Sequence, residues 1–202
     1  MRVDVTKIRP IHSSFFSCAQ DTETILKELF VKSGQYSDKL KRLLVINNPD
    51  CLDKNNQDYQ DLIDTKPLSV LRKEGYVRTN PKIARKEFEN IKSFILLTFD
   101  NFSSNAIDPK FLDCTVNFDI ICYDDEWDLD NFQIRPIAIA GYIDGILNSL
   151  SDNNKIAWQN RNSSSTVKLS GMGEYYFLGL NLVVLNEDIS MYTLSYRALH
   201  FT

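Results

Sequence analysis

Several features that identify membrane proteins and common enzyme classes are missing from this chain of 202 residues. No run of about 18 apolar residues occurs, so no segment is expected to cross a membrane. The sequence has no Walker loop, no G-x-S-x-G elbow and no G-x-G-x-x-G fingerprint, so none of these catalytic templates is indicated. The opening residues, MRVDVTKIRP, are too polar for a signal peptide, and secretion is not expected.

Histidine and cysteine are scarce and poorly placed for metal binding. The two histidines, His12 and His200, lie at opposite ends of the chain, and no C-x-x-C pair occurs. A Cys/His zinc site needs a spacing that is absent here. Cys114 and Cys122 fall on one predicted strand about 26 Å apart, at about 3.3 Å per residue, so they cannot bridge each other. We expect both to be core residues. All four thiols are expected to be reduced: Cys18, Cys51, Cys114 and Cys122.

The charge balance argues against a nucleic-acid-binding surface. The formal net charge is -4, and no basic cluster is longer than Lys39–Arg42. The apolar share of 43% and the charged share of 25% are typical of a soluble globular protein with a sizeable core. The length favours a single domain over residues 1–202. Within it, the polar, Asn- and Asp-rich sequence predicts a loop insertion at about 47–80.

Apolar periodicity predicts an α+β fold. The stretch 21–31 has apolar residues on one helical face, and a longer helical stripe runs from Phe132 to Leu150 in steps of four and three. Alternating or continuous apolar runs predict strands, the last two of which form a hairpin turning at 186–188. We therefore expect a mostly antiparallel β-sheet packed against one long amphipathic helix and an N-terminal helix. The predicted strands cover residues 42–47, 93–102, 115–123, 167–169, 175–185 and 189–201.

A dense acidic turn separates the strand at 115–123 from the long helix. Counted from Asp124 as a calcium loop of the EF-hand type, positions six and twelve should be Gly and Glu, but they are Leu129 and Arg135. The turn is therefore predicted to be an exposed scaffold loop whose acids favour the positive end of the following helix. Irregular cation binding is the alternative. The acids concerned are Asp124, Asp125, Glu126, Asp128 and Asp130.

A second acidic pattern gives an alternative function. Pro49-Asp50, followed by Asp64-Thr65-Lys66, fits the loose PD-(D/E)xK pattern of metal-dependent nucleases. In such enzymes two carboxylates hold Mg²⁺ and the lysine supports the attacking water. However, Pro67 would interrupt the strand that should carry the lysine. We therefore expect no catalytic, cofactor-binding or metal-binding residues, and the nuclease stays the alternative.

The order of elements resembles the tail-terminator and neck-connector proteins of tailed bacteriophages. The resemblance is carried by residues 114–150, as strand, turn and helix, and by the closing strands at 174–201. It implies a non-enzymatic virion protein in the neck or tail, assembled in the host cytoplasm as a homo-oligomeric ring (hexamer or dodecamer). The implied partners are portal, adaptor and tail proteins, with transient contact to packaged DNA and none to membrane.

If the chain forms a ring, some of its side chains should meet neighbouring subunits. Tyr59 and Trp158 stand in polar sequence, and they either contact a neighbour or cap the protein's own core. Gly141 and Gly145 lie one helical turn apart, so a second backbone is expected to come close to that face.

Overall fold

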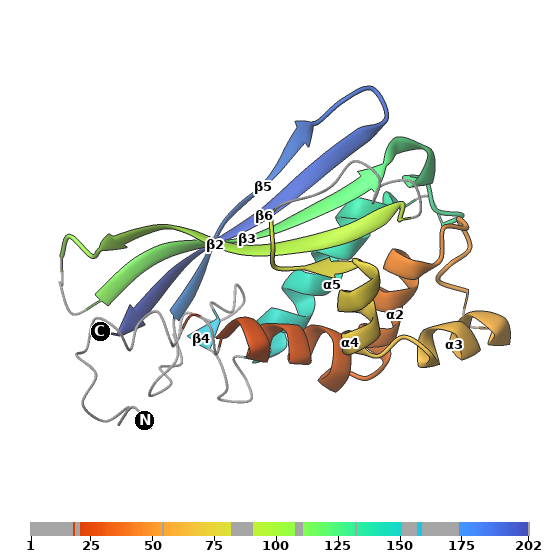
Figure 1. Cartoon of the computed structure of the whole chain (residues 1–202), viewed down its shortest axis with the longest axis horizontal. Helices are drawn as coiled ribbons and strands as arrows, with labels where there is room; N and C mark the ends of the chain where they lie inside the picture. Colours follow the sequence, from red (N-terminus) through yellow and green to blue (C-terminus); the bar gives the residue numbers. More distant parts are fainter. Residues whose placement is uncertain are drawn as a thin grey trace.

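Helices cover one face of a six-stranded sheet, with the strand order β1-β2-β3-β6-β5-β4 (Figure 1). The computed structural model describes residues 18, 21–53, 55–81, 91–107, 111–131, 133–150, 157–158 and 174–201. The helical segments are 21–27, η2 (Glu28–Lys32), α2 (Gln35–Val45), α3 (Gln57–Asp64), α4 (Leu68–Glu74), η4 (Asp124–Glu126) and α5 (Arg135–Leu150). The strands are β1 (Val77–Arg78), β2 (Ser93–Ser104), β3 (Phe111–Tyr123), β4 (Ala157–Trp158), β5 (Glu174–Val184) and β6 (Ile189–Phe201).

The four long strands are antiparallel, and this confirms the predicted α+β class. β3 pairs with β6 along its whole length, from Phe111 opposite Phe201 to Tyr123 opposite Ile189. β2 flanks β3, and β5 flanks β6, with which it forms a hairpin. The short strands β1 and β4 pair in parallel with β2 and β5. The predicted strand at 167–169 lies outside the described residues.

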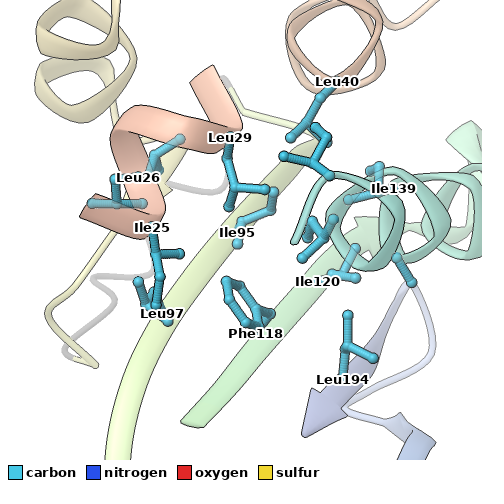
Figure 2. Close-up of a cluster of buried hydrophobic side chains, with 14 of the residues drawn as sticks. Ile25, Leu26, Leu29, Leu40, Ile95, Leu97, Phe118, Ile120, Ile139 and Leu194 are labelled. Carbon is cyan, nitrogen blue, oxygen red and sulfur yellow. The ribbon is translucent and has the colours of Figure 1, made fainter. Parts of the chain in front are cut away.

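The long helix packs on the sheet by its predicted stripe. Ile139 and Ile143 are fully buried, and they share a core cluster with Phe118 and Ile120 of β3. Figure 2 shows Ile139 beside Ile120, with Leu194 of β6 nearby. Pro136 is the second residue of α5, where its missing N–H costs no helical hydrogen bond.

The N-terminal helix fills the rest of this core. Figure 2 shows Ile25 and Leu29 directed at Leu97 and Ile95 of β2, and Leu26 belongs to the same core cluster, as the predicted helix at 21–31 requires. Its acidic residue Asp21 is buried, and the hydroxyl of Tyr175 donates a hydrogen bond to its carboxylate. Burial beside this carboxylate raises the pKa of Tyr175 well above its usual value. The bond ties the first helix to the start of β5.

The predicted strand at 42–47 is wrong, because this segment is the end of α2 and the turn after it. Leu40, Leu43 and Leu44 are all fully buried, and their spacing puts them on one helical face. A short apolar run such as RLLV suits a buried helix and a buried strand equally well. The helix begins directly after Gly34, whose φ of +53° suits glycine.

The segment at 47–80 also differs from the predicted polar loop, since it contains α3, α4 and β1. Ile63, Leu71 and Val77 are buried and join these elements to the core. The Asn56 side chain caps α3 by accepting a hydrogen bond from the Tyr59 N–H. The described residues of 47–56 form turns and irregular structure, as predicted, whereas many of the polar residues after them lie on the exposed faces of α3 and α4.

Candidate interaction surface

One edge of the sheet is open among the described residues. β4 pairs only with Glu174 and Tyr175, at the start of β5. From Tyr176 to Val184, β5 pairs with β6 on one side, and no described strand lies along its other side. An open edge presents a row of backbone N–H and C=O groups that another strand or chain can bind.

The open strand lacks the usual protection of a sheet edge. The sequence YYFLGLNLVVL, residues 175–185, contains no charged residue and no proline, both of which normally discourage edge pairing. One irregularity occurs, between Phe177 and Gly179. The large apolar side chains that are exposed along it are Phe177, Leu178, Leu182, Val183, Val184 and Leu185. Such a concentration is typical of interaction sites, which makes this strand a candidate surface.

The end of this hairpin is apolar on both faces. Side chains alternate along a strand, so Val183 points away from the face that Leu182 and Val184 share. All three are exposed, and Val184 reaches 67%. Figure 1 shows the β5–β6 hairpin projecting beyond the helices, which explains why neither face is covered there. We call residues 182–185 with the turn 186–188 the hairpin tip.

The acidic turn lies against the hairpin tip. The backbone N–H of Asp124 donates to the carbonyl of Asp188 at 3.0 Å. Asp124 and Asp125 are exposed, as predicted, and so are Glu187 and Asp188 in the tip. Lys92 lies 3.5 Å from Asp125. Asp124 and Asp125 therefore form one acidic end of the molecule together with the tip.

Of the acidic turn and the nuclease pattern, the structure brings together only Asp130 from the first and Asp50 from the second. Asp50, Asp53 and Asp130 line one shallow pocket of about 380 Å³. Asp128 instead forms an isolated bridge with Ile134. Across the described ranges, no three His, Cys, Asp or Glu side chains lie close enough to hold a metal ion. The pocket gives no geometric support for irregular cation binding.

The nuclease pattern is not assembled. The Asp50 carboxylate accepts a hydrogen bond from the Tyr59 hydroxyl at 2.7 Å, and the Asp64 carboxylate accepts one from Gln60 at 2.9 Å. Lys66 lies 2.6 Å from a Glu74 oxygen. The three residues occupy a turn, the end of α3 and the linker to α4. Each has a separate local partner, so their geometry gives the nuclease no support.

Tyr59 packs against the protein's own core, which favours the core-capping interpretation of this aromatic residue. Its hydroxyl also accepts a hydrogen bond from the Asn48 side chain at 2.8 Å. The side chain of Trp158 and that of His200 lie outside the described residues, as does the whole of His12. The four cysteines are buried, and Cys114 and Cys122 are core residues, as predicted.

A groove runs along the outward face of α5. It has a volume of about 730 Å³ and includes the exposed residues Gly141 and Gly145. A Cβ added at either glycine would meet no heavy atom of the described chain within 4 Å. The predicted close approach of a second backbone is therefore not made by the part of this chain that the structure describes. The other lining residues are Ser33, Tyr36, Gln133, Ile134, Ile137, Ala138, Tyr142 and Ile146.

Arg135 fixes the acidic turn and the groove relative to the helices. Only 1% of this residue is exposed, yet its guanidinium group has no carboxylate partner in the described ranges. Arg135 begins α5, but its guanidinium group lies at the C-terminal end of α2, where the helix dipole favours a cation. Five backbone carbonyls accept its hydrogen bonds at 2.7–3.0 Å, those of Leu43, Ile46, Asn47, Asn48 and Glu126.

Comparison with protein families identifies the chain's relatives. The family model described as YomW matches residues 37–198, which is about four-fifths of the chain. No curated protein and no solved structure gives a significant match. No helix in the described ranges is long and apolar enough to cross a membrane. The family name follows the style of Bacillus prophage proteins and supports a phage origin. The match covers α2, α5 and all six strands nearly to the end of β6, so the chain belongs to the YomW family.

Proposed function

We propose that this protein is a structural component of a phage particle. In this proposal it forms a homo-oligomeric ring, a hexamer or dodecamer, in the neck or tail connector, between the portal side and the tail. The observation that carries the proposal is the part of β5 from Phe177 to Val184, which has no charged side chain, exposes large apolar residues and has no described strand along its outer edge. The phage-style family name supports the setting.

The exposed strand favours self-association over catalysis. Apolar side chains on both faces of a projecting hairpin lose contact with water when another subunit covers them. The gain is roughly 25 cal/mol for each Å² buried. Stable interfaces bury about 800 Å² per partner, more than one strand supplies, so a second surface has to take part. A ring supplies such a pair of surfaces at every subunit contact.

The charge distribution is consistent with transient contact to packaged DNA in the channel of the ring. The net charge is -4, and the acidic end exposes four carboxylates. Such a surface repels the phosphate backbone and does not hold it. Contacts to portal, adaptor and tail proteins then use other surfaces of the ring.

The test is the molar mass of the purified full chain and of two lysine variants, measured by light scattering after size exclusion. Wild type is expected to be an oligomer, and Val184→Lys is expected to be a folded monomer. An exposed side chain can be replaced at a cost within about 0.5 kcal/mol. Val31→Lys is the matched control, since Val31 is 60% exposed but lies on η2. A monomeric wild type, or an oligomeric Val184→Lys, would contradict the proposal.

A further inference from the structure

We infer that the groove along α5 receives the hairpin tip of a second copy of this chain, so that subunits join head to tail. This inference rests on the proposed function and specifies its subunit contact. It starts from two exposed apolar surfaces of the described chain, the hairpin tip and the concave groove.

The groove has the size and lining of a binding site for apolar side chains. Its volume of about 730 Å³ lies within the range of ligand-binding pockets, roughly 300–1,000 Å³. Ile134 and Ile137 are partly exposed on its wall. Gly141 and Gly145 carry no side chains, and the space above them allows a second backbone to approach the helix closely.

The hairpin tip has the complementary shape. Leu182, Val183, Val184 and Leu185 are exposed at the end of the edge strand, where β6 is still paired with β3, and no residue of the tip lines the groove of its own chain. An edge strand with apolar side chains on both faces can enter a groove by its free edge and contact both of its walls. A flat sheet face could not do this.

Charge favours this pairing. Lys39 lies beside the groove, with its ammonium group 5.8 Å from the ring centroids of both Tyr36 and Tyr142. Within the described ranges, Lys39 forms no ion pair with a carboxylate. The tip ends in the exposed acids Glu187 and Asp188. Opposite charges at the rims of two apolar surfaces speed their encounter and fix their register.

The geometry has a consequence for assembly. Because the tip and the groove are different surfaces, each subunit can use its tip on one neighbour and its groove on the other. Such heterologous contacts generate closed rings or open filaments. Edge-to-edge pairing of two β5 strands about a two-fold axis would use the same surface twice and would stop at a dimer.

A mixing experiment with two full-length variants tests the inference. Val184→Lys damages the tip and leaves the groove intact. Gly145→Leu fills the groove and leaves the tip intact, and the new side chain has free space on a helix that favours leucine over glycine. Each variant alone is expected to be a monomer, with at least a tenfold loss of assembly. The equimolar mixture is expected to form a heterodimer, because one intact tip and one intact groove remain.

Three further variants sharpen the result. Ile137→Lys places a charge in the groove and should behave like Gly145→Leu, so a folding defect in either one does not decide the outcome. Lys39→Glu should weaken assembly, and combining it with Glu187→Lys should restore assembly. Thermal melts check that every variant is folded.

The possible outcomes separate this inference from the proposed function. If both folded groove variants assemble like wild type while Val184→Lys does not, the groove is not the docking site and the role of β5 stands. A mixture that stays monomeric also overturns the head-to-tail contact. If wild type itself is monomeric, the proposed function fails.

Discussion

Replacing Arg135 by methionine is expected to destabilise the fold strongly, although arginine is usually a surface residue. Its guanidinium group is buried and donates to five backbone carbonyls, so methionine of similar length leaves these acceptors without a donor. The substitution removes the donor, but the acceptors belong to the backbone and stay in place. An apolar side chain cannot donate a hydrogen bond to them. The loss therefore has the character of buried unsatisfied polar groups.

The magnitude follows from the two most buried acceptors, the carbonyls of Leu43 and Ile46. Each unsatisfied buried group costs about 1–3 kcal/mol, which gives about 2–6 kcal/mol for the pair. The other three acceptors are partly buried, and we assign them no cost because water can reach them. Since domains are stable by only about 5–15 kcal/mol, the variant should lose a large share of its stability.

Urea denaturation followed by circular dichroism measures this loss. Arg197→Met is the matched control, because Arg197 forms a bidentate pair with Asp113 but is largely exposed. Such a surface pair contributes about 0–1 kcal/mol. Arg135→Lys should fall between wild type and methionine, because one ammonium group cannot reach all five carbonyls. If Arg135→Met lost no more stability than Arg197→Met, the assigned role of the five hydrogen bonds would be refuted.

Three further outcomes follow from the core and from buried titratable groups. Ile143→Ala should cost about 2–5 kcal/mol in a denaturant melt, whereas Ile137→Ala, at an exposed position of the same helix, should stay within about 0.5 kcal/mol. Burial raises the pKa of Asp119, and the Thr193 hydroxyl donor only partly offsets this. Its ionised form therefore destabilises the fold above its folded pKa, so Asp119→Asn should raise the melting temperature at pH 7, with a gain that disappears below about pH 3.8. Burial also raises the pKa of Cys122 to about 11, so this thiol should resist a thiol reagent at pH 8 until the protein unfolds.

Long periodic segments carried most of the fold prediction. The alternation around Phe118 and the stripe through Ile143 each fit a single period, so β3 and α5 could be predicted from sequence. The short helices α3 and α4 could not, because each buries a single apolar residue, Ile63 or Leu71, and so shows no periodicity. The prediction for 42–47 was wrong for a different reason. Its continuous apolar run fits a buried helix and a buried strand equally well.

The candidate surface was harder to predict than the fold. An apolar strand such as β5 has the composition of a buried strand, and its exposure depends on which elements cover it in three dimensions. The sequence did hold one signal, since residues 175–185 lack both charge and a clean alternation at Leu182, Val183 and Val184. The exposed position of Asp124 and Asp125 was predicted, but their contact with the hairpin tip depends on the register of β3 against β6.

Assembly of identical copies through β5 and the hairpin tip is the central claim. Native mass spectrometry of the purified full chain, beside Val184→Lys, tests it most directly. We predict one closed stoichiometry for wild type, six or twelve copies, and a monomer for the variant. A wild-type spectrum containing only monomer, or an open-ended series of sizes shared by both proteins, would contradict the claim.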